Sequence, residues 1–509
     1  MDLLHAEKLR DRMHDRLVAR RPDIASDESY YKGDQPLSFA TKEWRDANAA
    51  RYSGFSDNWC GTVVNAEAER LDPIGVAGVG REEGEKLWDE LRRNEFDAQF
   101  SQGTVTALTT SRAFIMVWAD ADQNPLVTVE HPSQVEIEYD WENPRLRVAA
   151  LKTWVDDKLE YATLYSATLV FKWSRPRPDP KNDQESQAVQ GRSDASSGGG
   201  WLPRLGDRDD VWPVRNPLDL VPVVEISNRP TLSGDPVSEI RGVKPMQDAI
   251  NLLWAYLFLS ADYASMPARV ATGTAPPSIP IVDSTGKVIG SRPVEMKDLA
   301  EKRLLFLSGE NAKIDSWPAA ALNVFTDTIE IGVGHIAAQT RTPPHYLVAN
   351  KGLSNLSGDA LTAAEIGLVQ KSNEFITFTN PAIREVLRLV ALVKNERGLA
   401  AKAQLATIVW KDREIRSQSQ MADALVKKRQ IGYPFEFLLE QEGHSPATIS
   451  RILAMREEEL NDPQLAAALR PSGGDYGDSA DDGAAVSAAA GAGGDHGEGV
   501  SALVGADRN

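Results

Sequence analysis

The chain has 509 residues and a formal net charge of −18 at pH 7, which is enough sequence for about two to four domains. The charge argues against whole-chain affinity for nucleic acid or for an anionic membrane, because both need clustered Lys and Arg; it does not exclude a protein that encloses nucleic acid without gripping it. Its single cysteine, Cys60, excludes an intrachain disulfide and a cysteine-based zinc site.

The N-terminal part is predicted to be helical. Residues 1–21 have an amphipathic pattern and lack the apolar stretch of a signal peptide, so we predict a soluble intracellular protein. An aromatic pair, Tyr30-Tyr31, leads into a turn at Gly33-Asp34. Two further helices are expected over residues 58–71 and 82–97.

From Thr104 the pattern changes to β-branched and aromatic runs separated by turn residues, which predicts an antiparallel β region. Arg175–Asp210 is rich in Pro, Asp, Ser and Gly and is predicted to be a flexible surface insertion. The predicted strands are Phe114–Trp118, Leu126–Glu130, Val135–Tyr139, Arg145–Val155, Leu159–Trp173 and Leu220–Ile226.

The centre of the chain, Pro236–Asp359, has the order helix, β-containing insert, helix and polar loop. The first helix, about Val237–Ala264, has one apolar stripe, and Trp254 and Phe258 widen it, so more than one packing partner is expected. The second helix, about Ala319–Arg341, has a similar stripe and ends before two prolines. The stripes consist of Ile240, Val243, Met246, Ile250, Leu253 and Leu257, then Leu322, Phe325, Ile329, Gly332 and Ile336.

The insert, Ala268–Pro318, and the loop, Val348–Gly358, differ in pattern. The loop is polar, and Asp359 after it is expected to be the N-cap of the next helix. The insert contains three β-like runs, which are Ile279–Val282, Lys287–Ile289 and Arg303–Leu307.

The C-terminal part begins with a long helix over Ala360–Gly398, which Asn380-Pro381 should kink and Gly398 should cap. From Pro463 onward the Ala-, Gly- and Asp-rich sequence predicts a disordered acidic tail. Between them we expect a strand at Leu405–Trp410 and helices at Gln418–Gln430, Pro434–Glu442 and Pro446–Leu460, the last with Ser445 as N-cap.

The sequence contains no motif for catalysis. The phosphate-binding, serine-hydrolase and zinc-protease patterns are absent. His335 and His345 bracket a helix end without a third ligand, so we predict no metal site and no cofactor. Cys60 lies on an apolar helix face and is interpreted as a core residue. The chain is therefore predicted not to be an enzyme.

The order of these parts resembles the portal protein of tailed bacteriophages, in the branch of siphophages that infect Gram-positive hosts. The resemblance covers about Met1–Leu460 and excludes the insertion and the tail. It is carried, in order, by Tyr30–Asp34, Asn58-Trp59, Ala68–Leu71, Val221–Ile226, Asn228–Pro230, the helix–insert–helix unit and Thr342–Leu347.

The resemblance implies a mixed α+β portal fold and a division of the chain into named parts. These would be a wing (1–235), stem helix 1 (236–266), a clip (267–318), stem helix 2 (319–347), a tunnel loop (348–359), a long kinked wing helix with a short strand (360–416), a helical crown (417–462) and the tail (463–509).

The resemblance also implies a homo-oligomeric ring, usually of twelve subunits, assembled in the host cytoplasm and kept at one capsid vertex of the virion. Its partners would be double-stranded phage DNA in the channel, the terminase large subunit, a head-completion or adaptor protein, and the major capsid and scaffold proteins, with no membrane. The tunnel loop would present Asn350, Lys351, Ser354 and Asn355 to DNA, and the stem would pack the ring through Ile250, Leu253, Trp254, Leu257, Phe325 and Ile329.

Two alternatives stay open. A capsid or tail component is one, although such proteins usually devote their length to sheet. A Mg²⁺-dependent nucleic-acid hydrolase is the other, and it requires carboxylates that converge on a cleft.

Overall fold

The computed structural model combines helices and small sheets, which confirms the predicted mixed α+β class. It divides into two units, Met1–Leu453 and Ala454–Asn509, and the contacts below belong to the first. The residues that it describes are 1–35, 42, 46, 55–156, 158–176, 200–205, 211–232, 235–265, 269–272, 278–293, 304–307, 313–316, 321–347, 358–413, 418–444 and 446–461.

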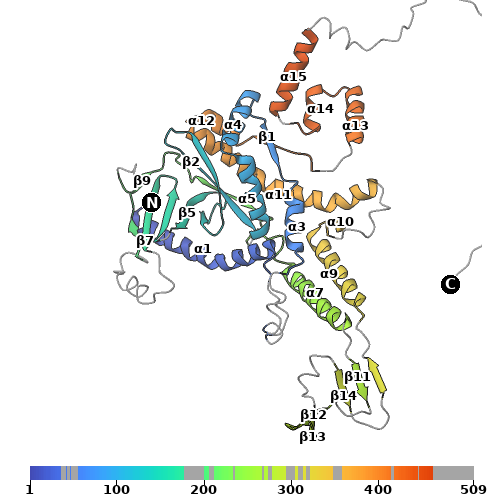
Figure 1. Cartoon of the computed structure of the whole chain (residues 1–509). Coiled ribbons are helices and arrows are strands. Elements are labelled where there is room, and N and C mark those ends of the chain that lie inside the picture. Colours follow the sequence, from blue (N-terminus) through green and yellow to red (C-terminus); the bar gives the residue numbers. More distant parts are fainter. Residues whose placement is uncertain are drawn as a thin grey trace, which may run out of the picture. The chain divides into compact units, whose positions relative to one another are not determined.

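The N-terminal part contains helices and antiparallel sheets (Figure 1). The helices are α1 (Leu3–Lys32), α3 (Trp59–Ala68), α4 (Arg81–Arg93) and α5 (Phe96–Thr110). One sheet has the order β4 (Val135–Tyr139), β5 (Arg147–Val155), β6 (Leu159–Ser166), β7 (Leu169–Pro176) and β8 (Leu202–Pro203), with β9 (Val214–Arg215) on β7. A second has the order β10 (Val223–Ser227), β2 (Arg112–Ala119) and β3 (Pro125–Glu130), and a third pairs β1 (Pro73–Ala77) with β16 (Thr407–Trp410).

Helix α1 is longer than predicted. Its apolar face packs Leu9 and Met13 in one cluster with Trp173, and Arg16 forms ion pairs with Glu136 and Glu138 of β4. The helix continues past residue 21, where Asp27 forms ion pairs with Arg241 and Lys244, and it takes in Tyr30-Tyr31, which were predicted to precede a turn. It ends at Gly33, whose φ of +87° suits a residue without a side chain.

The predicted strands are largely confirmed, and Val135–Tyr139 matches β4 in full. The run Leu159–Trp173 is two strands, β6 and β7, rather than one. Thr104, where the β region was predicted to begin, lies in α5. Packing outweighs the β propensity of the threonines there. Because Gly103 has no side chain, α5 lies directly against β3: a Cβ added at Gly103 would lie 2.9 Å from Val129 Cγ1.

Two further features of this part were not predicted. Strand β1 was missed. Within the predicted insertion Arg175–Asp210, β8 pairs with β7 and Trp201 is buried, so that part is structured. The remainder, 177–199 and 206–210, lies outside the described residues.

The central part contains α7 (Lys244–Ser265), α9 (Asn323–Thr340) and α10 (Pro344–Leu347). Helix α7 begins at Lys244 rather than Val237, because the preceding turns are held to α5: Ser238 Oγ donates to the Thr109 carbonyl at 2.6 Å. The three β-like runs are confirmed with shifted ends, and two more strands join them. The strands are β11 (Arg269–Thr272), β12 (Ser278–Val282), β13 (Val288–Pro293), β14 (Leu304–Leu307) and β15 (Lys313–Ser316), paired as β14-β11-β15 and β12-β13.

The C-terminal part begins with α11 (Gly358–Val393), so Asp359 lies inside the first turn rather than at the N-cap. Helix α11 includes Pro381 and ends before Asn395, whose φ is +59°; Gly398, the predicted cap, lies inside α12 (Arg397–Ala403). The three predicted helices are confirmed as α13 (Gln418–Gln430), α14 (Phe435–Gln441) and α15 (Pro446–Asn461). Ser445 and the tail lie outside the described residues.

One large apolar core joins these elements. Phe375, Ile383 and Val390 of α11 are buried in it, together with residues of α3, α5, β2, α7 and α9. Residues of α9, α10 and α11 are buried in this one core, so the three helices pack together. The paired helices α7 and α9 thus contribute buried residues to the same core.

Candidate functional site at the paired helices

Helices α7 and α9 lie side by side (Figure 1) and touch through their predicted stripes. Gly332 of α9 faces α7 so closely that a Cβ there would lie 3.2 Å from Ile250 Cγ1 and 3.6 Å from Met246 Sδ. Ile250 and Ile329 are both buried. Two of the predicted ring-packing residues therefore have their partners inside their own chain.

The other four predicted ring-packing residues are only half-buried. They are Leu253, Trp254 and Leu257 of α7 and Phe325 of α9. On α9, Val324 and Ile331 are 59% and 62% exposed. The part of α7 after Asn251 is apolar around its circumference, with Leu252, Tyr256, Phe258 and Leu259 also half-buried. A helix that is apolar on all sides is normally covered on all sides, and the described residues cover this one only in part.

The inner part of α7 is held by polar side chains. Gln247 Oε1 accepts a hydrogen bond from the Trp59 backbone N–H at 2.9 Å. Asn251 Oδ1 accepts one from the Asp57 backbone N–H at 3.0 Å. The Tyr30 hydroxyl donates to Asp248, at 2.7 Å from Oδ1 and 2.8 Å from Oδ2. These groups fix the end of α1 and the start of α3 to α7, and so orient the helix.

A buried ion cluster lies at the base of the helix pair. Lys371 Nζ of α11 is 2.9 Å from Glu67 Oε2, 2.8 Å from Glu239 Oε2 and 3.0 Å from the Thr340 carbonyl, which it donates to. Arg229 lies 2.8 Å from Glu239. Lys371 thus connects α11 to α3, to the turn before α7 and to the last turn of α9, where a cation also suits the helix dipole.

The charges of this cluster control one another's protonation. Burial raises the pKa of Glu67 to about 7, although Lys371 opposes this. Burial also acts on Glu239, but Lys371 and Arg229 outweigh it and hold the pKa of Glu239 below its usual value. For Lys371 the burial penalty is outweighed by the two carboxylates, so its pKa is raised and it carries its charge at neutral pH.

A second network joins the two sides of the predicted tunnel loop. His345 Nε2 in α10 is 2.8 Å from Glu365 Oε1 in α11. Arg70, at the end of α3, contacts the other oxygen of Glu365 and donates to the Tyr346 hydroxyl at 2.8 Å. The chain before and after the loop is therefore joined through one carboxylate. The loop residues Asn350, Lys351, Ser354 and Asn355 lie outside the described residues.

The described residues contain no group of three His, Cys, Asp or Glu placed to hold a metal ion. His335 is exposed, and His345 contacts Glu365. Cys60 is fully buried, and burial raises its pKa to about 12, which agrees with its interpretation as a core residue. Among the helices described, none is long and apolar enough to cross a membrane.

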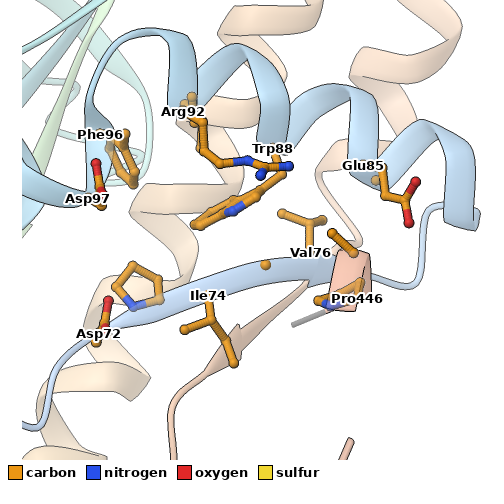
Figure 2. A pocket seen from close by; sticks show the side chains of 14 residues that line it. Asp72, Ile74, Val76, Glu85, Trp88, Arg92, Phe96, Asp97 and Pro446 are labelled. Carbon is orange, nitrogen blue, oxygen red and sulfur yellow. The ribbon is translucent and has the colours of Figure 1, made fainter. Parts of the chain in front are cut away.

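A hollow of about 280 Å³ lies between β1, α4 and the first residues of α15 (Figure 2). Trp88, Val76 and Ile74 form its apolar middle, while Glu85 and Asp97 lie at opposite ends in Figure 2. Glu85 accepts from the Ser450 hydroxyl at 2.7 Å. These two carboxylates do not converge as an acid–base pair, so this hollow offers an apolar contact surface.

Sequence reasoning missed the ion cluster, although one signal was present. Lys371 occurs on the apolar face of α11, three residues after Leu368 and four before Phe375. A cation at a core position requires buried carboxylates nearby. Their identity could not be predicted, because Glu67 and Glu239 are remote in sequence. On the same helix, Phe378, three residues after the buried Phe375, is 41% exposed.

Comparisons with known proteins identify a family and similar chains. The family model described as phage portal protein, SPP1 Gp6-like, matches residues 11–439. The portal protein of Mycobacterium phage L5 is 25% identical over 425 residues, covering 80% of this chain and 78% of its own. That of Mycobacterium phage D29 is 24% identical over 473 residues, covering 88% of each. A chain from the neck of a native GTA particle, computed with C12 symmetry, aligns with a TM-score of 0.42 and 12% identity over 75% of this chain and 89% of its own.

Proposed function

Because this chain belongs to the SPP1 Gp6-like family of phage portal proteins, we propose that it forms a closed ring of about twelve copies around a channel for double-stranded DNA. Portal proteins are structural parts of the virion, at the connection between head and tail. The ring would occupy one capsid vertex, where DNA enters during packaging and leaves during ejection.

The observation that carries this proposal is the incompletely covered surface of the helix pair. A ring closes through two different surfaces of one subunit, each of which meets the other on a neighbour. The outer part of α7, with Leu253, Trp254 and Leu257, supplies one apolar surface. The face of α9 that carries Val324 and Ile331 supplies the second. In this assignment α7 and α9 are the stem, and Ile250 and Ile329 hold its two helices together.

The channel would be lined in part by residues 348–357, joined at their base through His345, Glu365 and Arg70. An acidic chain repels DNA phosphates, so DNA would slide without adhering. Lys351, with Asn350, Ser354 and Asn355, would make weak contacts that do not depend on base sequence. Lys351→Ala should then leave ring assembly intact and change the length of DNA packaged; an unchanged length would contradict this role.

The segment between the stem helices would be the clip. In the β12-β13 hairpin, Ile279, Ile281, Val282, Val288 and Ile289 are all exposed. An isolated two-stranded hairpin is marginally stable, so a partner would stabilise it. We assign this partner as the terminase large subunit during packaging and a head-completion protein afterwards. The helices of 417–461 would form the crown, which faces the capsid interior.

The experiment is the mass of the purified protein by light scattering, with negative-stain images of the same fraction. We expect particles of about twelve times 55.7 kDa with a central hole. Ile331→Asp places a charge in the assigned interface and should prevent assembly. Leu405→Asp is the matched control, because Leu405 is also exposed but lies outside the helix pair. Rings that persist in Ile331→Asp would refute the assigned interface, and a compact monomer that cleaves DNA with Mg²⁺ would support the enzyme alternative.

A further inference from the structure

An arginine-lined hollow of about 720 Å³ lies between the β4–β5 turn, β10 and the middle of α11. Two of its arginines, Arg145 and Arg147, come from the turn and the start of β5, and two, Arg384 and Arg388, from α11. Four guanidinium groups around one hollow are notable in a chain with a net charge of −18. Such a local excess of positive charge attracts an anionic group.

The carboxylates that line this hollow already have partners. Glu385 lies 2.5 Å from an Arg147 nitrogen and 3.3 Å from Arg388 Nη1. Glu225 accepts from the Tyr139 hydroxyl at 2.9 Å and lies 3.4 Å from Arg112. Neither carboxylate forms an ion pair with Arg145 or Arg384.

Two of the four arginines therefore remain available to a ligand. Within the described part of the chain, neither Arg145 nor Arg384 has an ion pair. Arg384 Nε is also shielded from solvent and has no hydrogen-bond acceptor there. A shielded donor without an acceptor carries a free-energy cost, which an incoming oxygen atom would remove.

Apolar side chains border the same hollow. Phe378 is 41% exposed and Leu146 is 52% exposed, and Val221 and Pro381 also line it. A DNA duplex matches only the arginines of this surface, because its phosphates and sugars offer no apolar side chain to Phe378 and Leu146. A peptide that carries both carboxylates and apolar side chains matches both kinds of group.

We propose that this hollow is a docking site for an acidic segment of a partner protein, in which carboxylates alternate with aliphatic or aromatic side chains. Arg384 and Arg145 would each donate paired hydrogen bonds to a carboxylate, which the planar guanidinium does better than an ammonium group. Phe378 and Leu146 would receive the apolar side chains. The site does not depend on ring formation, since one copy of the chain supplies all of it.

The test is fluorescence anisotropy with a labelled peptide of alternating leucine and glutamate, added to the full chain. A leucine–lysine peptide and a short DNA duplex are the comparison probes. We expect the leucine–glutamate peptide alone to bind, and Arg384→Gln to weaken it by about tenfold or more. Arg145→Gln, at an exposed position, should weaken it as well. Arg397→Gln removes the same charge at an exposed position outside the lining and should leave the affinity unchanged.

Three outcomes would overturn the proposal. In the first, Arg384→Gln and Arg145→Gln bind the peptide as well as the wild type does. In the second, the DNA duplex binds in an Arg384-dependent way and the peptide does not, which would assign the hollow to nucleic acid. In the third, no probe binds and Arg384→Gln reduces the mass of the assembled particle, which would assign the hollow to contact between copies. Failure of ring assembly in the wild type, with peptide binding intact, would refute only the ring.

Discussion

Replacing Lys371 by methionine tests whether the buried ion cluster holds α11 to the base of the helix pair. Methionine keeps much of the side-chain length but removes the charge. In this variant Glu239 would keep its ion pair with Arg229, at 2.8 Å. Glu67 would have no ion pair left among the described residues. Glu67 and Lys371 side chains are each 1% exposed, so water cannot replace the lost cation. Leaving Glu67 ionised and unpaired in this way costs about 3–5 kcal/mol. Because the pKa of Glu67 is about 7 even beside Lys371, the full cost applies above neutral pH, where the exchange is measured.

Hydrogen exchange of the α11 amides measures this loss locally, which suits a long chain that is not expected to unfold in two states. Since about 1.4 kcal/mol corresponds to a tenfold change, we expect exchange to accelerate by roughly two to four orders of magnitude. Lys371→Met combined with Glu67→Gln removes the orphaned charge and should recover most of the protection.

Lys402→Met is the matched control for this experiment. Lys402 contacts Glu83 at 2.8 Å, but both side chains are well exposed, so its loss should cost less than about 1 kcal/mol. Equal losses in Lys371→Met and in the double variant would show that packing, rather than the unpaired carboxylate, causes the effect. Unchanged exchange in Lys371→Met would refute the reasoning altogether.

Three further predictions follow from burial and close contact. Gly332→Leu should destabilise the packing of α9 on α7 by about 1–3 kcal/mol, measured by hydrogen exchange of the α9 amides, because its side chain meets Ile250; the side chain of Gly334→Leu points into open space and should not have this effect. Because the folded state holds the Glu67 proton more tightly than the unfolded chain, the stability that protonated Glu67 contributes is lost as the pH rises from about 4.5 to about 7. Glu67→Gln should therefore change the pH dependence of the denaturation midpoint over this range, and an equal pH dependence in both proteins would contradict it. Cys60, buried and with a pKa raised to about 12, should react with a thiol reagent only after denaturation, and rapid reaction of the folded protein would contradict its burial.

Regular periodicity allowed much of the fold to be predicted. The stripes of α7 and α9 were identified because apolar residues recur at steps of three and four, and Ile250 and Ile329 are indeed buried. Where local preference and burial disagree, the prediction was wrong: the Thr-rich end of α5 is helical because β3 and β10 pack on it. Helix ends were also misplaced where an unexpected residue supplies the cap, as Asn395 does for α11.

The division of α7 into a polar, anchored part and an apolar, half-covered part could not be predicted from the sequence. No local sequence signal indicates that Asp248 and Asn251 anchor this helix. Their role depends on Tyr30 and Asp57, which are 218 and 194 residues away in the chain and reach α7 only after α1 and α3 have packed. Since the anchoring groups satisfy their hydrogen bonds within the chain, they leave nothing for a partner to recognise. In the proposed ring, the association of copies would rest on the apolar surface beyond Asn251 and on the exposed face of α9, so a charge placed at Ile331 should abolish the ring without unfolding its subunit.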